Sequence, residues 1–300
     1  MAEAPARGGA LARAALAGNP SDAYGGAVLA VTLEQFPAEA VAERADALTV
    51  TPASQLVEVT VRRFARELEG AALGTEVRWE TSIPLGVGLG GSSAIVIATL
   101  RALCGLYGSR LKPARLAALA LAIETEELGI AAGLQDRVAQ AYEGLTFMDF
   151  GPDGRYEQLD PKLLPPLVVA WRTEAAQDSD RVHGSLRTRF ERREPAVLSA
   201  MSKLGSLATD AQRALRAGDR HGFARAVDGT FEIRRQLVSL DPRHVEMVEC
   251  ARALEANANY TGSGGAIVAV CRDERHRARV LEALGRLGCG TLAVREGASR

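Results

Sequence analysis

A stretch of eleven residues with almost no side chains is the first feature of this sequence that could do chemistry. It reads Pro84-Leu85-Gly86-Val87-Gly88-Leu89-Gly90-Gly91-Ser92-Ser93-Ala94 and continues into the apolar segment IVIATLRAL. A glycine-rich turn between a strand and a helix leaves backbone N–H groups unshielded at the positive end of the helix dipole, where anions bind. A plain tight turn is the alternative, but it needs positive φ at only one or two positions. The stretch therefore predicts a phosphate-binding loop.

The residues on either side predict the strand and the helix that such a loop needs. Upstream, the segment VRWETSI at 77–83 alternates its side chains as a half-buried strand does. Downstream, apolar residues from Ile95 to Leu106 recur at helical spacing, with Ser92 or Ser93 in the N-cap position. We therefore expect a strand, the glycine loop and a helix in direct succession.

Other glycine and nucleophile motifs do not fit the loop. GxGxxG is satisfied by Gly86, Gly88 and Gly91, but no acidic residue follows about 20 positions later to bind a ribose. No lysine follows the glycines as in GxxxxGK[ST], and GxSxG does not occur here. The DFG at Asp149-Phe150-Gly151 lacks the other protein-kinase motifs. These four signatures give no support for a dinucleotide fold, a P-loop, a protein kinase or a serine hydrolase.

Composition excludes several classes of partner. The 300 residues are 47% hydrophobic and 24% charged, and 36 basic against 37 acidic residues give a net charge of -1. This balance gives no sign of nucleic-acid or anionic-membrane binding. The four cysteines are scattered, which argues against a zinc module or a disulfide framework. No apolar run suggests a membrane span, so we predict a cytoplasmic protein, and the first ten residues, MAEAPARGGA, are interpreted as a frayed terminus.

The remaining pattern mixes helices and strands without a regular βαβ alternation, which predicts an α+β fold. Further helices are expected at 113–128, 136–142, 195–216, 220–240 and 242–257. Strands are expected at 27–33, 144–149, 167–171, 266–271 and 290–294. The GPDG turn at 151–154 is the best point at which to divide the chain.

With Pro-x-x-x-Gly-Leu-Gly followed one residue later by Ser-Ser-Ala, the loop resembles that of the GHMP superfamily of galactokinase, homoserine kinase, mevalonate kinase and phosphomevalonate kinase. The resemblance implies that the loop wraps the phosphates of ATP and that a serine hydroxyl reaches Mg²⁺. Many members have serine or another small residue at the place of Gly91. The resemblance therefore leaves open whether the hydroxyl of Ser92 or that of Ser93 reaches Mg²⁺. The nucleotide-binding residues that it implies are Pro84, Gly86, Gly88, Leu89, Gly90, Gly91, Ser92, Ser93 and Ala94.

Two further segments are similar to the other motifs of this family. Tyr260-Thr261-Gly262-Ser263-Gly264-Gly265 precedes the apolar segment IVAV, although a hairpin turn explains this stretch equally well by itself. Near the N-terminus, Arg13, Gly18, Asp22 and the pair Gly25-Gly26 follow the first motif. The resemblance implies a two-domain fold with the active site in the cleft between the domains. Its N-terminal part, 11–155, would be like ribosomal protein S5 domain 2, and its C-terminal part, 156–300, ferredoxin-like.

Carboxylates for phosphoryl transfer are present between these motifs. On the residues alone, Glu124 to Asp136 is an acidic helix end followed by a loop and a new helix. In the family an acidic residue stands five positions before a glycine, as Glu124 stands before Gly129. The resemblance therefore implies that Glu124 is a Mg²⁺ ligand, that Asp136 is the general base and that Arg13 helps to lower the pKa of the attacking hydroxyl. Glu126 and Glu127 are interpreted as solvated neighbours.

The combination of GNPSD with GLQDRVAQ is most similar to glucuronokinase-type sugar 1-kinases, which implies a sugar or uronic acid substrate and a monomer or homodimer. A carboxylated sugar needs a cation, for which Arg137 and the basic run 181–189 are candidates, unless that run is only a solvated helix face. The substrate-binding residues that the resemblance implies are Asn19, Ser21, Asp22, Tyr24, Gln135, Arg137, Thr261, Gly262, Ser263 and Gly264.

Two alternatives remain at this point. The acceptor could be another sugar, a heptose phosphate or mevalonate on the same fold. The protein could also be an ATP-binding sensor without catalysis. The presence of Arg13, Glu124 and Asp136 together argues against the sensor, because such a protein could have lost any of them.

Overall fold

The computed structural model describes residues 4–68, 70–130, 132–173 and 186–295, arranged in two compact units. Of these described residues, the first unit comprises those within 1–12, 34–83 and 90–142, and the second comprises those within 13–33, 84–89 and 143–300. Strands β1 (Ala6–Ala17) and β2 (Ala27–Arg44) pair with each other and belong to both units. Because the units are discontinuous in sequence, a division at 155/156 stays a prediction.

The first unit contains a small sheet built on the second half of β2. Strand β4 (Thr75–Thr81) runs antiparallel to it, from Ala38 opposite Thr81 to Arg44 opposite Thr75. Strand β3 (Thr49–Thr51) pairs with β4 in parallel. The strand expected at 77–83 is therefore present, two residues earlier in the sequence.

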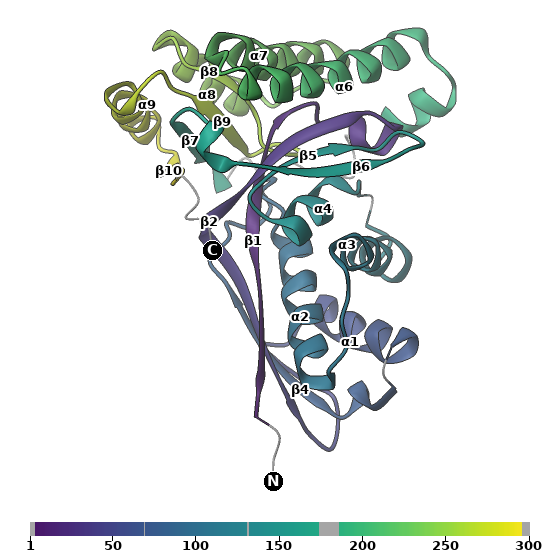
Figure 1. Cartoon of the computed structure of the whole chain (residues 1–300). Coiled ribbons are helices and arrows are strands. Elements are labelled where there is room, and N and C mark those ends of the chain that lie inside the picture. Colours follow the sequence, from purple (N-terminus) through teal and green to yellow (C-terminus); the bar gives the residue numbers. More distant parts are fainter. Residues whose placement is uncertain (1–3, 69, 131, 174–185, 296–300) are drawn as a thin grey trace. The chain divides into compact units, whose positions relative to one another are not determined.

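Helix α2 is the central helix of the first unit. It packs against β4 and against the unit's other α-helices, as Figure 1 shows for α1 and β4. Its residues from Ser93 to Ala98 are all buried, because neighbours cover the helix on every side. The helical segments of this unit are α1 (Gln55–Glu67), η2 (Gly70–Leu73), α2 (Gly91–Tyr107), α3 (Pro113–Ala122), the π-helical turn η3 (Ile123–Glu127) and α4 (Gln135–Tyr142).

The second unit contains two groups of strands. The first half of β2 pairs antiparallel with β5 (Leu145–Asp149), which pairs antiparallel with β6 (Arg155–Leu159). A separate antiparallel sheet has the order β10-β7-β9-β8, and its strands are β7 (Leu167–Trp171), β8 (Asn257–Tyr260), β9 (Ala266–Val270) and β10 (Gly290–Ala293). Strand β9 is buried at every position, which explains its unbroken apolar sequence AIVAV.

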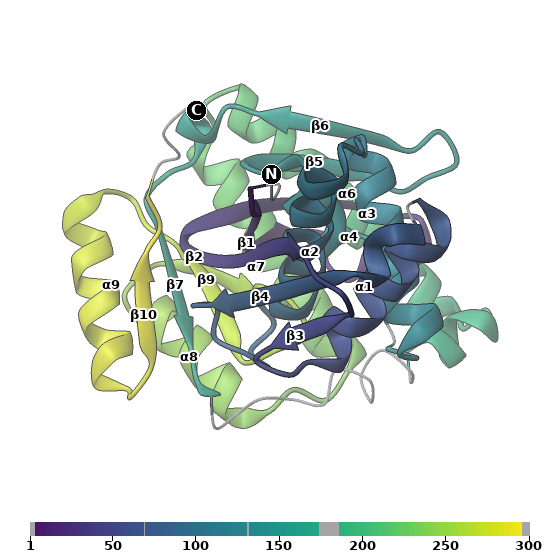
Figure 2. The ribbon, with the colours of Figure 1, turned by 90° about the horizontal axis from the view of Figure 1, so that it is seen from below.

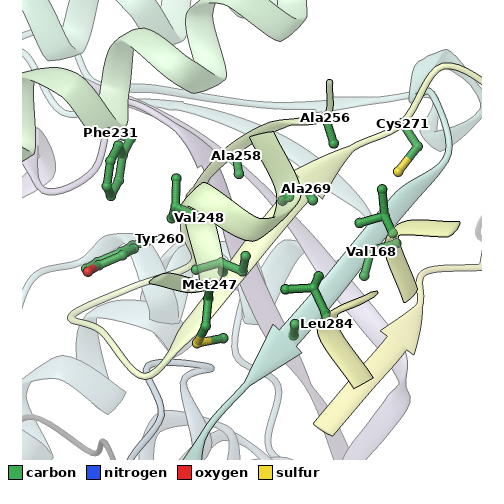
Figure 3. Packing of buried hydrophobic residues seen from close by; sticks show 14 residues of the cluster. Val168, Phe231, Met247, Val248, Ala256, Ala258, Tyr260, Ala269, Cys271 and Leu284 are labelled. Atoms are coloured by element: carbon green, nitrogen blue, oxygen red, sulfur yellow. The ribbon is translucent and has the colours of Figure 1, made fainter. Parts of the chain in front are cut away.

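Helices cover this four-stranded sheet. Helix α9 packs on β7 and β10 (Figure 2), α8 packs on β8 and β9, and α7 packs on α6 and β8. Figure 3 shows part of the core that they enclose, in which the rings of Phe231 and Tyr260 lie 5.5 Å apart near Met247 and Val248. The helical segments of this unit are η1 (Ser21–Tyr24), η4 (Pro161–Leu163), α6 (Pro195–Arg216), α7 (Arg220–Leu237), α8 (Pro242–Ala253) and α9 (Glu274–Arg286).

Three expectations about the positions of strands and helices are wrong. The N-terminal residues from Ala6 onward are not frayed but form β1, where an added Cβ at Gly8 would lie only 2.2 Å from the carbonyl oxygen of Ala98. Small residues are thus required because helix α2 packs directly on the strand backbone. The helix expected at 242–257 ends at Ala253, since the chain then enters β8. Strand β2 continues eleven residues beyond the predicted end at Leu33, to Arg44.

Candidate active site

The glycine loop follows β4 and opens α2, as predicted, but a glycine rather than a serine caps the helix. Gly86, Gly88 and Gly90 all have left-handed backbones, with φ of 74°, 72° and 74°. Gly90 is the N-cap, so the helix begins at Gly91 and the prediction of a serine N-cap is wrong. The Ser93 hydroxyl instead donates back to the Gly90 carbonyl at 3.1 Å. Three left-handed glycines are more than a simple turn needs.

The parts of the loop belong to different units. Pro84, Gly86, Gly88 and Leu89 belong to the second unit, where Leu89 is buried and its carbonyl accepts the backbone N–H of Arg13 at 3.0 Å. The residues from Gly90 to Ala94 belong to the first unit, where Ser92 is exposed while Ser93 and Ala94 are buried.

In the first unit, Ser92 faces a buried acid. Its hydroxyl donates to Glu124 Oε1 at 2.7 Å, and Glu124 is fully buried. Glu124 lies on the π-helical turn η3, and its backbone carbonyl accepts the N–H of Ile130 at 2.9 Å, beyond the end of the turn. Single π turns inside helices are frequent at functional sites. Two of the three residues predicted as metal ligands, Ser92 and Glu124, are thus in direct contact.

The acids after Glu124 are less free than predicted. Glu126 and Glu127 each accept a hydrogen bond of 2.8 Å from Arg63 Nη1 on α1, and Glu127 also pairs with Arg66. The side chain of Glu126 is still 61% exposed, whereas that of Glu127 is 24% exposed. Glu127 is therefore a partly solvated neighbour that arginines of α1 also hold.

Helix α4 presents the predicted base and its neighbours. The side chain of Asp136 is 17% exposed and lies 3.7 Å from Arg137 Nη1. Arg137 itself is buried against Glu124, to whose Oε2 its Nε donates at 2.7 Å. Gln135 is buried at the start of the helix. Gln140, which the sequence analysis missed, donates to the Gly90 carbonyl at 2.7 Å and so attaches α4 to the glycine loop.

In the second unit, residues of all three sequence motifs meet. Arg13 Nη1 donates to the carbonyl oxygens of Gly88 at 2.7 Å and of Thr261 at 2.6 Å. The Thr261 hydroxyl donates to the same Gly88 carbonyl at 3.1 Å. Arg13 and Thr261 are both buried, so these bonds are shielded from water.

Glycine is required where the two loops touch. A Cβ at Gly88 would lie 2.8 Å from the Gly264 carbonyl oxygen and 3.1 Å from the Ser263 nitrogen. One at Gly262 would lie 2.4 Å from the Gly88 carbonyl oxygen. This close backbone contact excludes the simple hairpin turn as the whole explanation of the third motif.

A buried arginine that no motif predicted holds the loop of the third motif, residues 260–265, which is called the third loop below. Arg234 on α7 donates to the carbonyl oxygens of Gly262 at 2.6 Å and Ser263 at 2.7 Å, with its guanidinium over the Tyr260 ring. Burial lowers the pKa of Arg234 to about 10. The available signal was an arginine at a core position of an amphipathic helix, three residues after the buried Phe231.

Residues of the first motif make hydrogen bonds that hold the local backbone in place. Asn19 is fully buried, donates to the Tyr260 carbonyl at 3.1 Å and accepts from Asn259 at 3.1 Å. The Ser21 hydroxyl donates to the Ala27 carbonyl at 3.0 Å. These bonds fix the turn that carries Asp22 and Tyr24, and substrate contact by any of these residues stays a prediction.

Tyr24 packs its ring on Phe190, with 4.6 Å between ring centroids. Burial raises the pKa of Tyr24 to about 12, an effect that Asp22 increases and Arg187 opposes. Residues 181–185 of the basic run lie outside the described residues. Within the described part of that run, Arg189 is bound to Glu194 and to the Leu237 carbonyl, whereas the Arg187 side chain is 77% exposed and pairs with Glu191.

Among the described residues, no group of three or more His, Cys, Asp and Glu side chains could hold a metal ion. The four cysteines have free thiols. In the same described ranges, no helix is both long enough and apolar enough to cross a membrane.

Comparisons with known proteins agree with this geometry. The GHMP kinases N terminal domain matches residues 55–144, and the GHMP kinases C terminal domain matches 211–288. A protein named Glucuronokinase 1 from Arabidopsis thaliana is 33% identical, over 90% of this chain and 86% of that protein.

Solved structures share the fold at lower identity. Lactococcus lactis galactokinase in complex with galactose has a TM-score of 0.82 at 14% identity, covering 99% of this chain and 94% of that one. A D-glycero-D-manno-heptose 1-phosphate kinase from Bacteriodes thetaiotaomicron has a TM-score of 0.74 at 22% identity, covering 96% and 94%. The predicted two-domain α+β fold is confirmed, and so is the prediction of an enzyme with kinase activity. The chain belongs to the GHMP kinases.

Proposed function

We propose that this protein is an ATP- and Mg²⁺-dependent sugar 1-kinase that phosphorylates the anomeric hydroxyl of D-glucuronate. The observation that carries the proposal is the 33% identity to Glucuronokinase 1, which extends over 90% of the chain. The presence of all three family motifs, whose residues Arg13, Gly88 and Thr261 meet in the second unit, supports it.

The residues proposed as metal ligands fit Mg²⁺, because Mg²⁺ prefers oxygen ligands and needs few of them from the protein. Ser92 Oγ and Glu124 Oε1 offer two oxygens 2.7 Å apart. Ser92 is the better candidate than Ser93, because Ser93 is buried and its hydroxyl is bound to Gly90. When bound, Mg²⁺ would neutralise charge on the ATP phosphates.

The protein's own part in the reaction is to hold the phosphates and to accept a proton. The backbone N–H groups at the start of α2, beside the left-handed glycines, suit the phosphates of ATP. Asp136 would accept the proton of the attacking hydroxyl, a task for a carboxylate within hydrogen-bond reach of that hydroxyl. Arg13 would assist by lowering the pKa of the hydroxyl, the role that the family resemblance gives it.

Recognition of the sugar is assigned to the first and third motifs. Asp22 and Tyr24 would bind hydroxyl groups, since a carboxylate accepts from two adjacent hydroxyls. Ser263, which is partly exposed in the third loop, would do the same. Arg187 is the best candidate in the basic run for the sugar carboxylate, because its side chain is exposed and it acts electrostatically on Tyr24.

The test is a coupled ADP-release assay with MgATP and a panel of acceptors: glucuronate, galacturonate, glucose, galactose, a heptose 7-phosphate and mevalonate. We expect turnover with glucuronate and at least tenfold lower kcat/KM with glucose, which lacks the carboxylate. A different preferred acceptor would refute the substrate but keep the kinase. Nucleotide binding without turnover on any acceptor would favour a sensor instead.

A further inference from the structure

We propose that Arg137 is a positioning residue, which holds the carboxylate of Glu124 so that only Oε1 faces Ser92 and a bound metal ion. The inference rests on the proposed function, which identifies Ser92 and Glu124 as the ligands of the metal ion. It differs from the expectation that Arg137 binds the carboxylate of the substrate.

The hydrogen bonds of the two side chains carry the inference. Glu124 Oε2 accepts from Arg137 Nε at 2.7 Å and also from Nη2, so both of its lone pairs are used. Glu124 Oε1 accepts from Ser92, and a carboxylate oxygen has two lone pairs. Arg137 Nη1 donates to the Gly133 carbonyl at 3.0 Å, which fixes the guanidinium to the loop before α4. The carboxylate therefore has one oxygen that Arg137 anchors and one oxygen that faces Ser92.

Both side chains of this ion pair are buried, which makes the pair important for the position of the Glu124 carboxylate. The side chain of Glu124 is 0% exposed and that of Arg137 is 5% exposed, so water replaces neither partner. A buried ion pair is broken at high cost, because removing one partner leaves a charge without compensation. Two N–H groups that donate to one oxygen also require the planar fork of arginine, which a lysine does not reproduce.

The same helix attaches the other side of Ser92. On α4, Gln140 follows Arg137 by three residues and so lies on the same helix face. Gln140 donates to the Gly90 carbonyl, two residues before Ser92, and Arg137 holds the acid that accepts from Ser92. Helix α4 thus fixes both the turn that presents Ser92 and the carboxylate beside it.

The experiment measures metal binding without turnover. Mn²⁺ serves as the probe, and its affinity is determined by electron paramagnetic resonance with a non-hydrolysable ATP analogue. We compare the wild type with Arg137→Gln and Arg137→Lys. The control is Arg115→Gln, which breaks an exposed ion pair to Glu67 in the same unit.

The proposal predicts that Arg137→Gln weakens Mn²⁺ binding about 10- to 100-fold, the usual effect of losing a group that orients a metal ligand. Arg137→Lys should lie between this variant and the wild type, and Arg115→Gln should match the wild type. Unchanged Mn²⁺ affinity in a folded Arg137→Gln protein would overturn the proposal. So would a selective rise in the KM for glucuronate over that for glucose, since it would mean direct substrate contact.

A double variant keeps the test valid if Arg137→Gln unfolds. The pair Glu124→Gln with Arg137→Gln carries no buried charge at these positions, so it should have a higher Tm than Arg137→Gln alone. Its Mn²⁺ affinity should equal that of Glu124→Gln, because Arg137 acts only through Glu124. Additive losses of Mn²⁺ affinity in the double variant would contradict the claim that Arg137 acts only through Glu124. A wild type that binds Mn²⁺ and analogue but phosphorylates no acceptor would refute the proposed function alone, and one that binds neither would overturn both.

Discussion

Two of the buried arginines, Arg137 in the first unit and Arg234 in the second, lie beside glycine segments and are bound by different kinds of group. In the first unit, Arg137 pairs with the carboxylate of Glu124. In the second, Arg234 donates to two backbone carbonyls and lies over the Tyr260 ring, and no carboxylate in the described part of the chain pairs with it. One arginine therefore positions a charged side chain, whereas the other positions a loop.

This difference suggests a division of tasks. The first unit carries the two acids to which the proposed mechanism gives a role, namely Glu124 and Asp136. The second unit carries backbone geometry, in which Gly88 and the third loop are in close contact. Changes at these two acids should thus affect catalysis and metal binding most, and changes at the contact between Gly88 and the third loop should affect stability and the order of the loops.

The largest effect is expected for Asp136→Asn. Loss of the proposed general base should lower kcat about 10²-fold or more, while binding of the ATP analogue stays within about twofold of the wild type. Coupled ADP release and calorimetric titration measure the two quantities. Asp153→Asn, in an exposed turn, is the matched control and should leave both unchanged. Equal kcat in Asp136→Asn would remove this residue from the mechanism.

A smaller but still large effect is expected for Gly88→Ala. The left-handed φ of 72° and the 2.8 Å approach to the Gly264 carbonyl oxygen leave no room for a methyl group. Backbone strain of this kind costs about 1–3 kcal/mol, and the displaced loops add to it. Denaturant unfolding gives the free energy. As a control, Gly285→Ala on α9 meets no atom within 4 Å and should be neutral or slightly stabilising. Equal stability of the two variants would show that the loops do not pack as described.

Replacement of Arg234 sharpens the comparison of the arginines. Arg234→Met removes the donors to Gly262 and Ser263 and leaves two carbonyls without partners, at a cost of about 1–3 kcal/mol. No buried carboxylate is left behind, so the free energy of unfolding should fall less than in Arg137→Met. A larger loss in Arg234→Met than in Arg137→Met, measured by urea unfolding, would contradict the division of tasks.

The smallest effect concerns acid stability in the second unit. Hydrogen bonds from Arg243 lower the pKa of Asp241, the N-cap of α8, to about 2. A lowered carboxylate pKa contributes stability above the unfolded value of about 3.9, and this stability is lost as the pH falls towards 2. Asparagine caps a helix as well as aspartate does, so the loss in Asp241→Asn comes from the ion pair with Arg243 and should be up to about 1 kcal/mol at pH 6, as for other exposed ion pairs. The difference should narrow between pH 4 and pH 2, and a constant difference would contradict the assignment.

Much of the fold was predictable where local signals were strong. Prolines marked the starts of α3, α6 and α8, and the apolar runs of β7 and β9 were recognised as strands. The N-terminal strand was missed because alanine and glycine have low strand propensity, and their small size is explained only by the packing of α2 on Gly8. Helix α9 was missed although His276, Val280 and Leu284 repeat every four residues.

In the candidate site, too, only residues with a local sequence signal were predictable. The motif residues were found from their order in the sequence, and contacts such as Ser92 with Glu124 follow that prediction. The supporting residues Arg234 and Gln140 were not found, because their partners are backbone carbonyls far away in the sequence. No local pattern marks such partners. The structure was needed to identify them.

The most direct test of the central claim is to follow one reaction mixture of the protein, MgATP and glucuronate by ³¹P and ¹H NMR. We predict a new phosphomonoester signal whose phosphorus couples to the anomeric proton of the sugar, together with stoichiometric ADP. Phosphate on another carbon, or no new phosphomonoester while ATP binds, would contradict the claim that this GHMP kinase is a glucuronate 1-kinase.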